Sequence, residues 1–151
     1  MSGHGIIRLP AEWEPQSAVQ LTWPHAKSDW AGTLHDVEPC FDAIAVAISR
    51  FEPVIIACPN PEHVKARLER AGAEMERVRL YQAETNDTWA RDHGPITVVR
   101  DGSLMLLDFA FNGWGGKFPA ELDDSLTTAL FAKKAFGDIA MESIPVVLEG
   151  G

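Results

Sequence analysis

The segment NDTWARDHGP (residues 86–95) concentrates more polar chemistry than any other part of this 151-residue chain. It contains two carboxylates, an amide, an indole, a guanidinium and an imidazole, and it ends at Gly-Pro. Because its residues follow neither a helical nor an alternating apolar period, the pattern predicts a loop, and loops on a rigid scaffold often carry binding groups. A solvated connection with Asp and Asn in its turns would have the same composition. Composition alone therefore favours a plain connection, and only the order of the residues points to a binding segment.

Predicted strands and helices alternate on both sides of this loop. Asn60-Pro61 predicts a helix N-cap and first turn, Gly72 predicts that helix's end, and Asp36 is the expected N-cap of the preceding helix. Asp101-Gly102 between two apolar runs is a strong hairpin signal. The expected strands are 18–23, 53–58, 75–81, 96–100, 104–109 and 144–148, and the expected helices are 36–50, 61–71 and 119–135.

Burial is expected wherever apolar residues share a face. The continuous apolar run 53–58 is typical of a strand covered on both faces, and 144–148 is also expected to be a buried strand. Free cysteine is among the most buried residue types, so Cys40 and Cys58 are expected to be structural. The expected buried stripes of the first two helices are Val37, Phe41, Ile44 and Ile48, then Val64, Leu68 and Ala71.

Charge and hydropathy exclude several classes of protein. The net charge of −9 argues against nucleic-acid binding, which depends on Lys and Arg neutralising phosphates, and is compatible with a cationic small-molecule ligand. No apolar run approaches the length of a membrane span, and the N-terminus lacks the pattern of a secretory signal. We therefore expect a cytoplasmic protein that binds neither membrane nor nucleic acid, with its two cysteines reduced.

Three further segments carry distinctive order. They are LPAEWEP (9–15) with LTWP (21–24), DFAFNGWGGKF (108–118) and LEGG (148–151). Together with NDTWARDHGP, and in this order along the chain, they resemble the agmatine deiminases and the related bacterial-type peptidyl-arginine deiminases of the pentein, or guanidino-group-modifying, superfamily.

The resemblance implies a fold that the strand order alone would not give. Alternating strands and helices indicate an α/β class and could be mistaken for a doubly wound sheet. The family fold is a five-bladed α/β propeller of ββαβ-like units, of which this chain would supply about two. Residues 1–151 would then be a single partial domain, the N-terminal portion of a deiminase catalytic domain that stops after LEGG. Such a piece is expected to form a homo-oligomer or to associate with the missing C-terminal half, because it leaves strand edges unpaired.

The resemblance also assigns roles to residues. Asp92 and Glu149 match the carboxylates that grip a substrate guanidinium, which presents paired N–H donors to such groups. Trp89 matches an aromatic wall, and Trp114 and Gly116 belong to a loop that approaches the ligand closely. The structural alternatives are an ion pair between Asp92 and its neighbour Arg91, a polar strand end for Glu149 and a core position for Trp89.

The implied mechanism is covalent. A Cys thiolate attacks the guanidinium carbon, a His assists the loss of ammonia, and water releases a ureido product, with no metal or organic cofactor. Neither Cys40 nor Cys58 matches the nucleophile position, so the nucleophile and the His are expected beyond this chain, which alone should be inactive. The five histidines lack zinc-site spacing, and GWGGK lacks the Ser or Thr of a phosphate-binding loop.

The predicted function is therefore hydrolysis of a guanidino substrate, most simply agmatine to N-carbamoylputrescine and ammonia. A first alternative is a peptidyl-arginine deiminase that forms citrulline, which would be expected to carry an Arg near 109–116, where there is none. A second alternative is a non-catalytic remnant that acts as a binding or interaction module.

Overall fold

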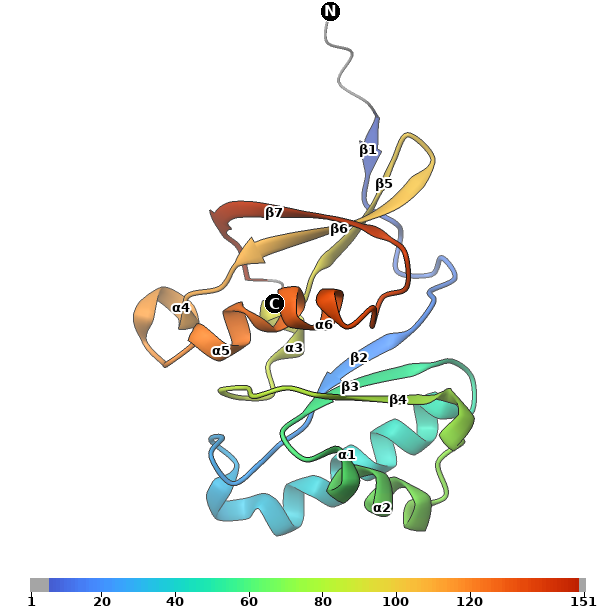
Figure 1. The fold of residues 1–151 in the computed structure, drawn as a ribbon, viewed down its shortest axis with the longest axis vertical. Coiled ribbons are helices and arrows are strands. Elements are labelled where there is room, and N and C mark those ends of the chain that lie inside the picture. The colour runs from blue at the N-terminus through green and yellow to red at the C-terminus, as the bar shows by residue number, and fades with distance from the viewer. Residues whose placement is uncertain (1–5, 150–151) are drawn as a thin grey trace, which may run out of the picture.

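The computed structural model describes residues 6–149, which form two sheets with helices below and between them (Figure 1). The strands are β1 (Ile7–Arg8), β2 (Val19–Thr22), β3 (Val54–Cys58), β4 (Val78–Gln82), β5 (Ile96–Arg100), β6 (Ser103–Ala110) and β7 (Ala140–Val147). The helices are α1 (Leu34–Ser49), α2 (Pro61–Ala71), α3 (Ala90–His93), α4 (Gly113–Gly116), α5 (Glu121–Asp124) and α6 (Leu126–Ala132), with 3-10 turns at Ala31–Thr33 and Met75–Arg77.

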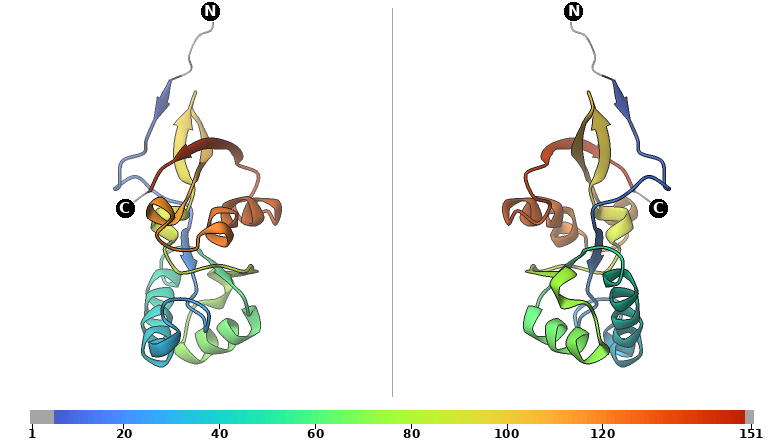
Figure 2. Two further views of the ribbon diagram at one scale, coloured as in Figure 1. Left: turned by 90° about the vertical axis from the view of Figure 1, so that its left-hand side faces the viewer. Right: turned by 90° about the vertical axis from the view of Figure 1, so that its right-hand side faces the viewer.

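The lower sheet is parallel and has the order β2-β3-β4. Helices α1 and α2 connect its strands and lie together against its lower face (Figures 1 and 2). Helix α2 begins and ends as the sequence predicts: the Asn60 side chain accepts a hydrogen bond from the His63 N–H, and Gly72 ends the helix in the left-handed conformation.

Strand β3 is the centre of the core, and all five of its residues are buried. Its alternating side chains contact two different layers, as the pleat of a strand requires. On one side Val54, Ile56 and Cys58 join Trp23, Ala45, Val64 and Leu68, and on the other Ile55 and Ala57 join Leu126, Leu130 and Ala135. The expectation of a strand covered on both faces is confirmed.

The upper sheet has the order β1-β5-β6-β7. Strands β5 and β6 form the predicted antiparallel hairpin, in which Asp101 and Gly102 both have positive φ, and β7 runs parallel to β6 after the crossover through α4 to α6. Residues 96–147 therefore follow the order strand, strand, helix, strand. The α/β class is confirmed, and within residues 6–149 both sheets are open.

Several local expectations were wrong, chiefly at element ends and helix faces. Helix α1 starts at Leu34 and not at Asp36, which lies in its first turn and is not the N-cap. Its buried face contains Ala45, while Ile44 is 44% exposed, because α2 and β3 cover a face rotated by one residue. Ala71, at the end of α2, is likewise exposed.

Longer segments also differ from the sequence patterns. Residues 119–135 form two short helices separated at Ser125, and residues 75–77 form a 3-10 turn ahead of β4. Strand β7 is largely exposed because it lies at a sheet edge: Val146 is 58% exposed and Val147 47%. Cys40 is exposed on α1, whereas Cys58 is buried as expected.

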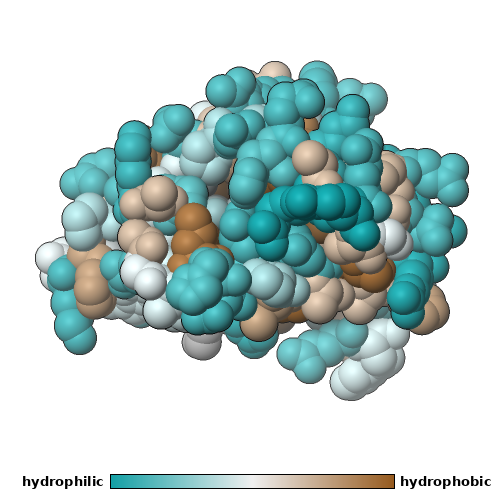
Figure 3. Space-filling model, turned by 90° about the horizontal axis from the view of Figure 1, so that it is seen from below, coloured by the Kyte–Doolittle hydropathy of each residue, from teal (hydrophilic) through white to brown (hydrophobic). Residues whose placement is uncertain are grey.

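The lower face of the molecule is mostly hydrophilic, with scattered hydrophobic patches (Figure 3). This face is formed over α1 and α2. The whole sequence carries 22 acidic and 13 basic residues. Within residues 6–149, no helix combines the length and the apolar character that crossing a bilayer would require.

Candidate active site

The centre of the motif segment is a single helical turn, α3, rather than a continuous loop. It lies between the two sheets, and the N–H of Asp92 bonds to the carbonyl of Trp89 at 2.9 Å. The Asp92 side chain is half-buried and makes no hydrogen bond or ion pair with residues 6–149. The ion pair with Arg91, the structural alternative for Asp92, is therefore not formed. A carboxylate left without a partner is able to accept donors from a ligand.

Two predicted site residues from different motifs meet at this point. The rings of Trp89 and Trp114 are edge to face, with centroids 5.7 Å apart. Trp114 makes the same type of contact with Phe111 at 5.3 Å and with Phe118 at 5.7 Å. Trp89 is 41% exposed, so it is not the core tryptophan of the structural alternative. The two indoles form one aromatic surface that is open to solvent on the Trp89 side.

The α4 turn presents Trp114 through an unusual backbone. Asn112 caps the turn by accepting a hydrogen bond from the Gly115 N–H at 2.8 Å, and Trp114 itself has φ 57 and ψ 54. A left-handed conformation is costly for a large side chain and clusters at functional sites. Gly116 has φ 77 and is exposed, so its backbone faces solvent beside the aromatic surface.

The second predicted carboxylate, Glu149, is exposed just beyond β7. The preceding residue, Leu148, donates its N–H to the carbonyl of Ala110 at 3.2 Å, which ties the LEGG segment to the residue before Phe111. Gly150 and Gly151 lie outside the described residues.

The beginning of the motif segment is anchored by residues, such as Trp30, that no sequence motif marks. The indole N–H of Trp30 donates to the Thr88 hydroxyl at 2.9 Å, and Asp87 accepts the N–H of Thr88 at 2.8 Å and that of Asp29 at 3.3 Å. Asp87 is buried. Trp30 lies 58 positions from its partner, so no local sequence pattern could have identified it.

His93, next to Asp92, points into the protein. It is 3% exposed, lies 6.0 Å from the ring of Phe111, and neither ring nitrogen has a hydrogen-bond partner within residues 6–149. Burial lowers the pKa of His93 to about 4, so the ring is neutral at physiological pH. A buried, neutral imidazole packed near Phe111 indicates a structural role for His93.

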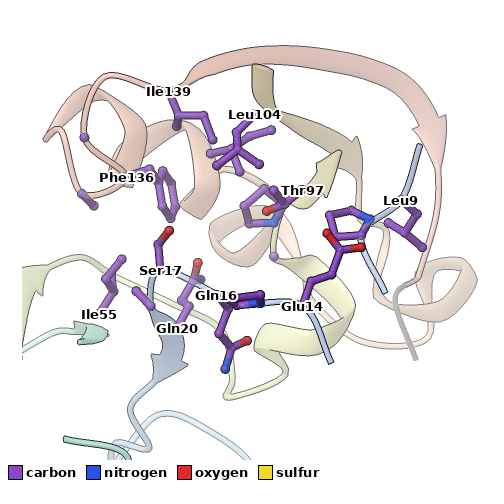
Figure 4. Close-up of a pocket in the computed structure, with 18 of the residues that line it drawn as sticks. Leu9, Glu14, Gln16, Ser17, Gln20, Ile55, Thr97, Leu104, Phe136 and Ile139 are labelled. Carbon is purple, nitrogen blue, oxygen red and sulfur yellow. The ribbon is translucent and has the colours of Figure 1, made fainter. Parts of the chain in front are cut away.

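A cavity of about 850 Å³ lies beside the motif segment, and it is lined by Ala90, Gly94 and Pro95 of that segment together with residues from 9–18 and from both sheets (Figure 4). Gln16, Gln20 and Phe136 are among its lining residues, and none of the five predicted site residues is. One of its carboxylates, Glu14, is already engaged by Arg8 at 2.7 Å and 3.0 Å. Cavity size alone does not identify the site, and the partner-free carboxylate and the aromatic surface favour the α3–α4 region.

The two cysteines lie apart from this region. Burial raises the pKa of the Cys58 thiol to about 12, so it is not a thiolate near neutral pH. Cys40 is on α1, at the lower face of the molecule. Over residues 6–149, no group of three His, Cys, Asp or Glu side chains is placed to hold a metal ion.

Known proteins are similar to this chain in sequence and in fold. The model of the Porphyromonas-type peptidyl-arginine deiminase family matches residues 8–151. Agmatine deiminase of Stutzerimonas stutzeri is 37% identical over 110 residues (72% of this chain, 29% of that protein), and that of Pseudomonas aeruginosa strain LESB58 is 32% identical over 151 residues (96% and 40%). A structure of C. jejuni agmatine deiminase with substrate bound superposes with a TM-score of 0.83 at 34% identity, covering 97% of this chain and 42% of that one. The chain thus spans less than half the length of these relatives. By sequence and by fold, it belongs to the Porphyromonas-type peptidyl-arginine deiminase family.

Proposed function

We propose that the α3–α4 region forms part of the substrate site of a hydrolytic deiminase, and that the substrate is agmatine. The observation that carries the proposal is the half-buried Asp92 carboxylate, which has no partner among residues 6–149 and lies one helical turn from the exposed Trp89. A guanidinium is a planar cation whose paired donors fit a carboxylate, and its alkyl chain can pack along an aromatic surface. The names of the agmatine deiminases reported above support the choice of substrate.

In this proposal the two carboxylates act on different parts of the same planar group. Asp92 and Glu149 each accept N–H bonds from the guanidinium, and this orients its carbon for attack and stabilises positive charge as the reaction proceeds. Trp89 and Trp114 pack against the aliphatic part of the substrate, and the exposed backbone at Gly116 lies within reach of it.

The nucleophile is proposed to lie outside residues 1–151. Covalent attack on a guanidinium carbon needs an activated thiolate, and the buried Cys58 with its raised pKa does not supply one. The relatives are more than twice as long as this chain, which leaves room in them for the thiol and the acid/base His. We propose that the 151-residue chain alone is inactive, and that it associates with another copy of itself or with a C-terminal half, of which only the C-terminal half would supply both groups.

Peptidyl-arginine is the second candidate substrate, because the family description names it. A peptide substrate would bring a carboxylate or carbonyl groups to the site, and Arg is the preferred partner of a carboxylate. Residues 109–116 contain no Arg, and this favours a substrate without a carboxylate.

The test is a binding comparison on the chain itself. We propose ligand-observed NMR titrations with agmatine and with putrescine. Putrescine has the same alkyl chain but an ammonium in place of the guanidinium, so the comparison separates guanidinium recognition from simple attraction to a protein of net charge −9. Charge-assisted hydrogen bonds contribute about 1.5–3 kcal/mol net, so agmatine should bind at least roughly tenfold more tightly than putrescine. Equal affinities would contradict the proposal, and tighter binding of a peptide with C-terminal arginine would favour the second candidate.

A further inference from the structure

The short segment from Asp123 to Thr128 hydrogen-bonds to both motif segments of the site. It joins α5 to α6 through Ser125, whose backbone is helical (φ −84, ψ −7), so residues four apart lie on the same face. This gives two parallel rows of polar side chains. The first row is Asp123 with Thr127, and the second is Asp124 with Thr128.

The first row holds both ends of the NDTWARDHGP segment. The Asp123 carboxylate accepts the N–H of Asn86 at 2.7 Å and that of Asp87 at 3.1 Å. Four residues later the Thr127 hydroxyl donates to the carbonyl of His93 at 3.3 Å. Asp123 is 2% exposed and Thr127 fully buried, so water does not compete for these bonds.

The bond to the start of the segment is reciprocal. The Asn86 side-chain oxygen accepts the N–H of Leu122 at 2.8 Å and that of Asp123 at 3.2 Å. Burial raises the pKa of Asp123 to about 6, although both accepted N–H bonds favour its charged form. Each segment thus satisfies backbone donors of the other, and this fixes their separation.

The second row holds the chain that leads into the FNGWGG turn. The Asp124 carboxylate accepts the N–H of Phe111 at 2.6 Å, and the Thr128 hydroxyl donates to Asp108 at 3.2 Å. Phe111 in turn contacts Trp114. The second row therefore fixes the strand end that presents Trp114, just as the first row fixes the turn that presents Trp89.

We propose that Asp123, Asp124, Thr127 and Thr128 are positioning residues, which set the edge-to-face contact of Trp89 with Trp114 by holding the two motif segments at a fixed spacing. The relevance of this spacing to catalysis rests on the proposed function. The spacing itself does not, and it can be measured without any ligand.

The test uses the coupling between the two indoles. Two tryptophan rings in close, non-parallel contact produce an exciton couplet in the far-ultraviolet circular dichroism spectrum, and Trp89→Phe and Trp114→Phe should each remove it. If the couplet is still present in each of the two single variants, the two rings are not held together and the proposal is overturned. Because no ligand is present, failure of the agmatine titration leaves this test unaffected.

The carboxylates are then compared with their amides. Asp124 accepts one N–H, which an Asn oxygen can also accept, so Asp124→Asn should keep the couplet and Asp124→Ala should lose it. Asp123 accepts N–H groups on both oxygens, and an Asn would turn an NH₂ toward one of them. Asp123→Asn and Asp123→Ala should therefore both lose most of the couplet.

This asymmetry separates positioning from other roles. If only the negative charge of the side chain were needed, both Asn variants would lose the couplet. If only its packing were needed, both would retain the couplet. Either result overturns the proposal, as does loss of the couplet in the control Asp138→Ala, whose side chain is 97% exposed. If an Asp123 variant shows no cooperative thermal transition, Asp124→Ala against Asp124→Asn decides the outcome, with Thr128→Val expected to weaken the couplet.

Discussion

Replacing Asp92 with Asn is the most direct test of the site. The substitution keeps the shape of the side chain and removes its charge, so it converts a two-oxygen acceptor into one oxygen and one NH₂ group. Asp92 is half-buried and has no hydrogen-bond partner within residues 6–149. Removing the charge therefore breaks no interaction within residues 6–149.

The two expected effects differ widely in size. A substitution that breaks no internal contact usually changes stability by about 0.5 kcal/mol or less, which corresponds to a shift in Tm of about 2 °C or less for a chain of this size. A charge-assisted contact to a guanidinium contributes about 1.5–3 kcal/mol, so agmatine affinity should fall about 10- to 100-fold. In a complete deiminase the same change should lower kcat/KM at least about 100-fold, because the contact strengthens as charge is fixed in the transition state.

The assay pairs the agmatine titration with thermal unfolding of the same samples. Asp101→Asn is the matched control: Asp101 lies in the hairpin turn with φ 50, a conformation that Asn adopts readily, so affinity and Tm should both be retained. A drop in Tm of several degrees for Asp92→Asn, with normal agmatine binding by the folded protein, would contradict the assignment of Asp92 to the substrate site. Asp92 would then be a structural residue.

Three further predictions concern single side chains. Gly113→Ala should lower the urea midpoint more than Gly115→Ala, since a Cβ at 113 would overlap a backbone carbonyl oxygen and one at 115 meets no atom within 4 Å; equal midpoints would contradict this packing. Cys40 is exposed and Cys58 buried, so a thiol reagent should modify one cysteine in the native chain and two in urea, and rapid modification of both in the native chain would disprove the burial. Burial lowers the pKa of His93 from 6.5 to about 4, so the stability that the neutral ring contributes is complete above about pH 6.5 and declines as the pH falls toward 4. The urea midpoint of the unsubstituted chain should therefore fall between about pH 7.5 and about pH 5.5, and His93→Leu should make this fall smaller. An equal fall in both proteins would argue against a buried neutral ring.

Elements with local signals could be predicted from the sequence. Asn60 and Gly72 bound α2 because capping depends on residues within one turn, and Asp101-Gly102 forms the hairpin because the turn needs positive φ at both positions. The buried face of α1 could not be predicted as well. Ile44 and Ala45 differ by one position, and only the placement of α2 and β3 decides which of them is covered.

The site was predicted in the same uneven way. The motifs identified Trp89 and Trp114, and the structure places their rings in contact across 25 positions of sequence. The residues proposed to hold them, such as Asp123, carry no motif, because an Asp that accepts backbone N–H groups from residues 36 and 37 positions away resembles any surface Asp in sequence. The prediction that 144–148 is buried was wrong for a related reason. An apolar run predicts a strand, but the other strands decide whether that strand lies at a sheet edge.

The pairing of β1 with β5 has a consequence for the order of folding. It joins Ile7 to Arg100 and Arg8 to Val99, so two residue pairs close a loop that contains the whole lower sheet. Strands β2 to β4 are each linked to the next by one helix, so their pairing closes short loops. Strand β1 can pair only after the distant hairpin has formed, and the entropy cost of closing a loop rises with its length. Both residues of β1 are exposed, so little burial compensates for that entropy. Strand β1 is therefore expected to dock last during folding and to detach first from the native state, as a local opening that amide hydrogen exchange at residues 7 and 8 would detect long before global unfolding.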